Sequence, residues 1–139
     1  MQDLVKDWMI DLVVYVHPDD LVLDALAKMR RRYLNSLIVK PTEDSMEYGI
    51  LTTTDICDKI VAQGRDPSKT RIREIMSSPL IAISPDETIF ECARRMHTHQ
   101  IHQLPVVDQD NGIVGMISAT DFLVVAEALG HGGEDRKLS

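Results

Sequence analysis

Gly49-Ile50-Leu51-Thr52-Thr53-Thr54-Asp55 and Gly115-Met116-Ile117-Ser118-Ala119-Thr120-Asp121 share one pattern, Gly-x-x-Thr/Ser-x-x-Asp, in the two halves of the chain. The similarity extends outward from both stretches. The other aligned pairs, each 67 residues apart, are Val5–Met9 with Ile72–Met76, Val16–Asp20 with Ile83–Glu87, and Leu37–Val39 with Leu104–Val106. Because so many positions match at a nearly fixed spacing, we interpret the chain as a duplication.

Each copy has the apolar pattern of a β-α-β-β-α unit. Apolar residues three and four apart predict one amphipathic helix per copy. The buried faces are predicted to be Val22, Ala25, Leu26 and Met29 in the first copy, and Ile89, Cys92, Ala93 and Met96 in the second. Strands are predicted over 12–16, 36–40 and 48–52, and over 80–83, 103–107 and 113–118. Closing helices are predicted over 54–62 and 120–129.

The domain organisation follows from the duplication. We expect one repeat over 5–63, a second over 72–129, a polar linker over 64–71 and a flexible tail over 130–139. One copy alone has too little sheet and helix to bury its apolar face well. The predicted fold class is therefore α/β (α+β), with the two repeats packed sheet to sheet.

Composition limits the possible functions. The net charge of −7 and the lack of a basic stripe argue against nucleic-acid binding. The N-terminus lacks a signal-peptide core, and no apolar run is long enough to span a membrane, so we expect a cytoplasmic protein. Cys57 and Cys92 match no metal or disulfide pattern and are predicted to be small buried apolar residues.

Together, the β-α-β-β-α repeat, the Pro-Asp before the first helix and the Gly-x-x-Thr/Ser-x-x-Asp motif resemble the CBS domain family over roughly residues 5–129. The tandem arrangement resembles the paired module of that family, which implies that the two repeats pack by pseudo-twofold symmetry through their small sheets. The resemblance implies clefts between the repeats that bind AMP, ADP, ATP or another adenosyl compound, and it implies regulation of an associated protein. It also implies a homodimer that assembles through helices.

The closing motif suits a nucleotide on physical grounds as well. A helix N-terminus favours an anion, and the hydroxyls of Thr52 and Ser118 can reach a phosphate. Asp55 and Asp121 can each accept hydrogen bonds from both hydroxyls of a ribose. The same residues also fit a capping box, in which they only cap their own helix. Both interpretations remain open, and they are compatible.

This chain differs from other members of the family in the basic residues near the closing motif. Family members that hold phosphates tightly often have a basic residue between the Thr and the Asp, where this chain has Thr53-Thr54 and Ala119-Thr120. The energy-sensing kinase subunits of the family have a His-Arg pair just before the second strand. At the equivalent positions this chain has His102-Gln103 in the second copy and Asn35-Ser36 in the first. His102 remains a candidate phosphate contact. We therefore favour AMP, or an uncharged adenosyl ligand, over ATP, with ADP and S-adenosylmethionine as further alternatives.

The candidate binding residues form two groups, and we expect neither a catalytic residue, a metal ligand nor a required cofactor. The polar group comprises Thr52, Thr54, Asp55, Ser118, Thr120, Asp121 and His102. Base contacts, which the resemblance implies, comprise Val14, Leu37 and Ile38, with Ile81, Leu104 and Pro105 from the other copy. Under a purely structural interpretation, most of these apolar residues belong to the core.

Rival functions have weaker support. His97, His99 and His102 are spaced poorly for a metal site and lack a nearby carboxylate or cysteine. Arg30, Arg31 and Arg32 fit a solvated helix end. No motif of a known catalytic class is present, so a small enzyme is disfavoured. The main alternative to a nucleotide sensor is a ligand-free scaffold for dimerisation or partner docking.

Overall fold

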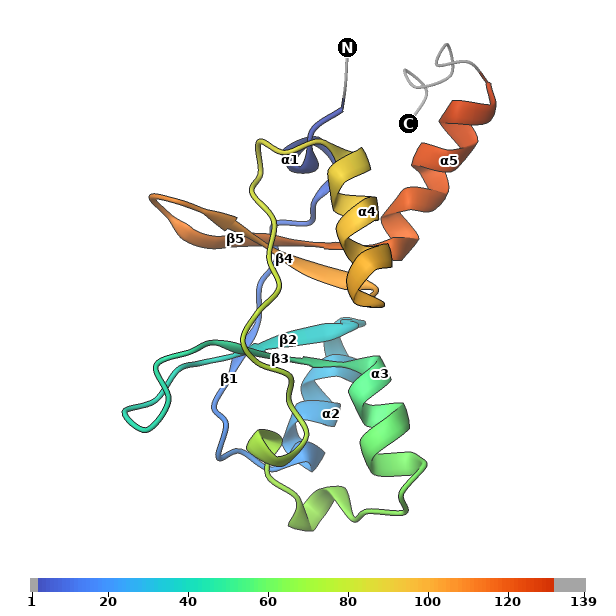
Figure 1. Ribbon diagram of the computed structural model, residues 1–139. Helices are drawn as coiled ribbons and strands as arrows, with labels where there is room; N and C mark the ends of the chain where they lie inside the picture. The colour runs from blue at the N-terminus through green and yellow to red at the C-terminus, as the bar shows by residue number, and fades with distance from the viewer. Residues whose placement is uncertain (1–2, 132–139) are drawn as a thin grey trace. The chain divides into compact units, whose positions relative to one another are not determined.

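The computed structural model describes residues 3–131, which form two compact units (Figure 1). The first-repeat unit comprises residues 13–81, and the second-repeat unit comprises residues 82–131 with residues 3–12. The opening segment of the chain packs on the second repeat, because the Val5 N–H donates to the Glu87 carbonyl at 2.8 Å. The opening segment of the second repeat packs on the first-repeat unit, where the Ile72 N–H donates to the Asp20 carbonyl at 2.9 Å.

The first-repeat unit is built on a three-stranded sheet in the order β1-β2-β3. Its elements are β1 (Tyr15–Val16), α2 (Val22–Arg32), β2 (Ser36–Val39), β3 (Gly49–Thr52) and α3 (Thr53–Ile56). β1 pairs parallel with β2, and β2 pairs antiparallel with β3. α3 continues into a π-helical segment, Cys57–Val61, and 3-10 turns follow at Pro67–Lys69 and Ile72–Glu74. In Figure 1, α2 and α3 lie on the same side of this sheet.

The predicted amphipathic helix of the first repeat is confirmed. Val22, Ala25 and Met29 of α2 are buried in one cluster with residues of β2 and β3, and Leu26 packs against that cluster half-buried. α2 ends at Arg32 because Tyr33 adopts the left-handed conformation, with φ of 56°. The arginines 30–32 are exposed in the last turn, as predicted.

The predicted burial of Cys57 is wrong. Its neighbour Ile56 is half-buried against the core and Ile60 is 4% exposed, so these two residues occupy the inward positions four apart. A residue one position after Ile56 is rotated by about 100° and points away from that face. Cys57 is therefore exposed, whereas Cys92 in the second repeat is buried as predicted.

The second-repeat unit is built on an antiparallel hairpin, β4 (Gln103–Asp108) with β5 (Gly112–Ser118). Its helices are α1 (Val5–Trp8), α4 (Ile89–His99) and α5 (Phe122–Gly130), with a 3-10 turn at Ala119–Asp121 before α5. Gly112 has φ of +74° where the hairpin turns. Three of the four residues predicted for the buried face of α4 are buried, while Ala93 is exposed.

The strand predicted over 80–83 is reduced to one isolated parallel bridge between Ile83 and Val106. In the first repeat the N–H of Ile38 donates to the carbonyl of Val14 at 2.9 Å and extends the pairing. Pro105 stands at the position of Ile38, and proline has no N–H to donate. The strand predicted over 12–16 is also shorter, because only Tyr15–Val16 pairs along β2 as a strand.

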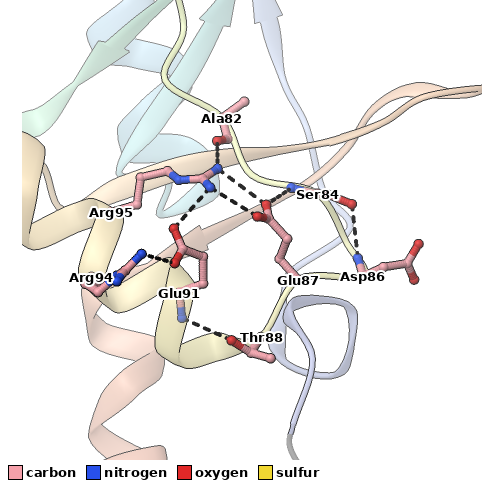
Figure 2. Close-up of polar contacts among 8 residues, drawn as sticks. All are labelled: Ala82, Ser84, Asp86, Glu87, Thr88, Glu91, Arg94 and Arg95. Atoms are coloured by element: carbon pink, nitrogen blue, oxygen red, sulfur yellow. Dashed lines mark hydrogen bonds and ion pairs between the residues drawn. The ribbon is translucent and has the colours of Figure 1, made fainter.

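An arginine of α4 forms hydrogen bonds with the extended segment that precedes the helix (Figure 2). Arg95 donates to the Ala82 carbonyl at 2.7 Å and to Oε1 of Glu87 at 3.1 Å. Glu87 in turn accepts the N–H of Ser84 at 3.0 Å. The extended segment before α4 is therefore held on the helix that follows it.

The predicted linker and tail are described only in part as expected from the sequence. Thr70, within the predicted linker 64–71, is buried, and its carbonyl accepts the Val22 N–H at 2.9 Å. Of the predicted tail 130–139, Gly130 ends α5, and residues 132–139 lie outside the described residues. In residues 3–131, no helix has the length and apolar character needed to cross a bilayer.

Candidate functional site

The first closing motif lies where β3 passes into α3. The N–H of Thr52 donates to Oδ2 of Asp55 at 2.9 Å, and the N–H of Asp55 donates to Oγ1 of Thr52 at 3.2 Å. These two hydrogen bonds form a capping box at the start of α3. The predicted capping interpretation is therefore confirmed for this repeat.

The second oxygen of Asp55 also has partners. Nζ of Lys59 lies 3.0 Å from Oδ1, and Oγ of Ser77 lies 3.4 Å from the same atom. Asp55 is only 6% exposed. A buried carboxylate is retained only when it is paired and hydrogen-bonded, and both conditions hold for Asp55.

The second closing motif, between β5 and α5, has fewer partners. The N–H of Ser118 donates to Oδ2 of Asp121 at 2.8 Å, and Oγ of Ser118 lies 3.3 Å from that oxygen and 2.7 Å from Oγ1 of Thr120. Within the described residues of the second-repeat unit, 3–12 and 82–131, no hydrogen bond or ion pair is made to Oδ1 of Asp121. Asp121 is half-buried. One oxygen caps the helix, and the other remains available.

His102 lies next to the second closing motif, because its carbonyl accepts the N–H of Ala119 at 2.8 Å. Its side chain is exposed. Asn35 makes the equivalent backbone contact with Thr53 at 3.1 Å in the first repeat. Thr54 and Thr120 are exposed in the first turns of their helices. The structure therefore brings the polar candidates of each repeat together at one strand-to-helix junction.

Of the apolar candidates, four lie on β2 and β4, whereas Val14 and Ile81 lie outside the strands. Val14 is half-buried beside Ile38, while Leu37 belongs to the core cluster of the first-repeat unit. Leu104 and Pro105 are buried on β4 of the second-repeat unit, whereas Ile81 is half-buried and ends the first-repeat unit. Burial of this kind also fits a purely structural role, so contact with a base remains a prediction.

Sequence reasoning missed Lys59. The residue lies four positions after Asp55, a spacing at which oppositely charged side chains meet on one face of a helix. Its Nζ also donates to the carbonyl of Ile75 at 2.8 Å. The spacing is visible in the sequence, but the carbonyl partner comes from the opening segment of the second repeat and has no sequence signal.

A groove of about 580 Å³ in the first-repeat unit is lined by none of the candidate residues. Its lining residues are His17, Asp19, Pro41, Thr42, Glu43, Asp44, Met46 and Arg73. Nε of Arg73 donates to Oδ1 of Asp19 at 2.7 Å, so its main cation is already paired. Within residues 3–131, no group of three or more His, Cys, Asp and Glu side chains is placed to hold a metal ion.

Comparison with known proteins decides the family. The CBS domain model matches the chain twice, over residues 5–62 and 72–127. The chain belongs to the CBS domain family. This tandem CBS pair is 34% identical over 120 residues to the CBS domain-containing protein YhcV of Bacillus subtilis, covering 86% of this chain and 83% of the relative. It spans 52% of the mitochondrial CBSX3 protein of Arabidopsis thaliana, with 34% identity over 76% of this chain.

Solved structures share the fold of the CBS pair. A hexameric CBS-CP12 protein from bloom-forming cyanobacteria superposes with a TM-score of 0.85 at 32% identity, covering 94% of this chain and 75% of that one. The CBS domain pair of protein MJ0100, solved with 5′-methylthioadenosine and S-adenosyl-L-methionine, superposes with a TM-score of 0.76 at 27% identity. That match covers 95% of this chain and 99% of the MJ0100 pair. The predicted mixed fold with small sheets is confirmed.

Proposed function

We propose that this CBS pair is a regulatory module that binds an adenosyl compound through the closing motifs of its repeats. The observation that carries the proposal is the recurrence of a hydroxyl residue and an aspartate, three positions apart, at the same strand-to-helix junction of both repeats. The ligands named for the MJ0100 pair, S-adenosylmethionine and methylthioadenosine, support the ligand class.

A carboxylate suits the ribose of such a ligand. The two vicinal hydroxyls of a ribose donate hydrogen bonds, and hydrogen bonds to a charged acceptor are about twice as strong as neutral ones. Asp121 keeps one oxygen without a donor from the described residues of its own unit, and Ser118 holds the other in place through its N–H. A bound ribose would therefore meet a carboxylate that is already oriented.

The charges around the motifs favour a ligand with few phosphates. Between the hydroxyl residue and the aspartate, the chain has Thr53-Thr54 and Ala119-Thr120, so neither repeat supplies a cation there. A di- or triphosphate needs several cationic or N–H donors to balance its charge. AMP, with His102 as the phosphate contact, or S-adenosylmethionine is accordingly the proposed ligand, ahead of ADP and ATP.

The proposal includes a cytoplasmic homodimer that engages a regulated protein partner. Three apolar residues of α5 support a protein contact: Leu123 is 71% exposed, Leu129 is 51% exposed and Val124 is 43% exposed. A helix that is apolar on its outer face as well as its inner one is typical of an interface. The same exposed residues favour the second candidate function, a ligand-free scaffold.

A ligand panel tests the proposal. The melting temperature of the full chain is measured with AMP, ADP, ATP and S-adenosylmethionine, and with GMP as the control for the base. A ligand at 100 times its Kd stabilises the folded protein by about 2.7 kcal/mol. We expect AMP or S-adenosylmethionine to raise the melting temperature and GMP to leave it unchanged. A flat response to all adenosyl compounds would leave the scaffold function.

Sedimentation of the ligand-free chain tests the assembly. We expect a dimer for the native chain and a monomer for Leu123→Glu, because a carboxylate in an apolar interface is strongly disfavoured. A monomeric native chain would contradict the proposed homodimer.

A further inference from the structure

We infer that the CBS pair binds one adenosyl ligand per chain, at Asp121, and that Lys59 prevents a ribose from binding at Asp55. The inference rests on the proposed function. It adds which repeat binds the ligand and which residue prevents the other repeat from binding it. It is carried by the different surroundings of two equivalent aspartates.

The carboxylate of Asp55 has no oxygen left for a ribose hydroxyl. Oδ2 accepts the N–H of Thr52 at 2.9 Å, and Oδ1 lies 3.0 Å from Nζ of Lys59 and 3.4 Å from Oγ of Ser77. A ribose hydroxyl has to displace the ammonium of Lys59 to reach Oδ1. That exchange replaces a charged donor by a neutral one on a buried carboxylate, which is unfavourable.

Lys59 is fixed rather than free to swing away. Its Nζ also donates to the carbonyl of Ile75 at 2.8 Å, and the Ile75 residue is only 1% exposed. The lysine lies in the π-helical segment Cys57–Val61. Its ammonium therefore has two partners, a carboxylate and a carbonyl, and displacement by a ligand breaks both contacts.

The second repeat lacks both residues that occupy Oδ1 of Asp55. The residue four positions after Asp121 is Val125, which is apolar and 6% exposed. The position equivalent to Ser77 is Ile10, whose N–H pairs with the carbonyl of Met116 as Ser77 pairs with Ile50. Neither side chain can donate to a carboxylate. Oδ1 of Asp121 is consequently the oxygen that a ribose can reach at lowest cost.

Calorimetric titration of the full chain tests the inference, with S-adenosylmethionine and AMP as the probes. We expect one site per chain, and at least a tenfold loss of affinity in Asp121→Asn. Adding Lys59→Met to Asp121→Asn should restore one site, now at Asp55. Lys28→Met in the same background is the matched control, because Lys28 contacts the carbonyl of Tyr15 at 3.4 Å and not Asp55, and it should restore nothing.

Melting curves establish that each variant is folded, and Lys59→Gln replaces Lys59→Met if the latter unfolds. Two sites per chain in the native protein would overturn the inference and leave the proposed function standing. So would a folded double variant, Lys59→Met or Lys59→Gln with Asp121→Asn, that binds neither probe. If the native chain binds neither probe, the proposed function fails and the inference fails with it.

Discussion

The guanidinium of Arg95 lies 3.1 Å from Oε1 of Glu87, which stands eight residues earlier and outside α4. The same guanidinium donates to the carbonyl of Ala82, so one side chain fastens both ends of the segment that leads into the helix (Figure 2). In the first repeat, Lys28 reaches the equivalent carbonyl of Tyr15 at 3.4 Å with a single donor. The fork of an arginine allows the second repeat to make several bonds where the lysine makes one.

Arg95→Met is expected to lower the free energy of unfolding by about 1–2 kcal/mol, because the pair is only partly exposed and the Ala82 carbonyl loses its donor. The matched control is Arg94→Met. The Arg94 side chain is 76% exposed and pairs with Glu91 at the surface, so that change should cost less than about 0.5 kcal/mol. Urea denaturation measures both. Equal losses would show that the Arg95 network contributes no more than a surface ion pair.

Gly115→Ala is expected to destabilise the protein by about 1–3 kcal/mol, because the added methyl overpacks a closed site. Its Cβ would lie 2.6 Å from the carbonyl oxygen of Ile10, a backbone atom that pairs with Met116. At the equivalent Gly49, Sδ of Met76 at 3.0 Å can move aside, and the nearest backbone atom, the carbonyl oxygen of Ser77, lies farther away, at 3.2 Å. Gly49→Ala should therefore cost less. The opposite order in urea denaturation would contradict the described packing of residues 3–12 on the second repeat.

Stability should fall at alkaline pH through Cys92. Burial raises the pKa of this thiol from 9.0 to about 12, so the folded state keeps the proton that the unfolded state loses. Below pH 9 the thiol is protonated in both states and does not change the free energy of unfolding. As the pH rises from 9 to 12, the free energy of unfolding falls progressively, because the unfolded state loses the proton first. At pH 10 the loss is at most about 1.4 kcal/mol relative to pH 7. Cys92→Ala should lack this component, and identical pH profiles for both proteins would contradict the assignment.

The two cysteines should also differ in reactivity. Cys57 is exposed and Cys92 is buried, so a thiol reagent at neutral pH should modify one group per folded chain and two in denaturant. Cys57→Ser should abolish the fast reaction. Fast modification of both thiols in the native protein would contradict the burial of Cys92.

The sequence predicted the elements well because their patterns are local. The spacing of Val22, Ala25 and Met29 identified α2, and the alignment of the two closing motifs identified equivalent strand-to-helix junctions. The burial of Cys57 was predicted wrongly, because Ile56 and Ile60 occupy the inward face. The strand over 80–83 was lost through a single proline, Pro105, on its partner strand.

Contacts between residues far apart in the chain could not be predicted from the sequence. The alignment of Val5–Met9 with Ile72–Met76 shows that the segments are equivalent, but it does not show that each packs on the other repeat. The pairing of Lys59 with Asp55 follows a familiar helix spacing. Its bond to the Ile75 carbonyl depends on where the chain returns, and that is a property of the folded unit.

The central claim is that an aspartate at a strand-to-helix junction accepts the hydroxyls of a ribose. The most direct measurement compares the calorimetric Kd values of AMP and 2′-deoxy-AMP for the native chain. Because a hydrogen bond to a charged group contributes about 1.5–3 kcal/mol, the deoxy compound should bind at least about tenfold more weakly. Equal affinities, or no binding of AMP at all, would contradict the claim.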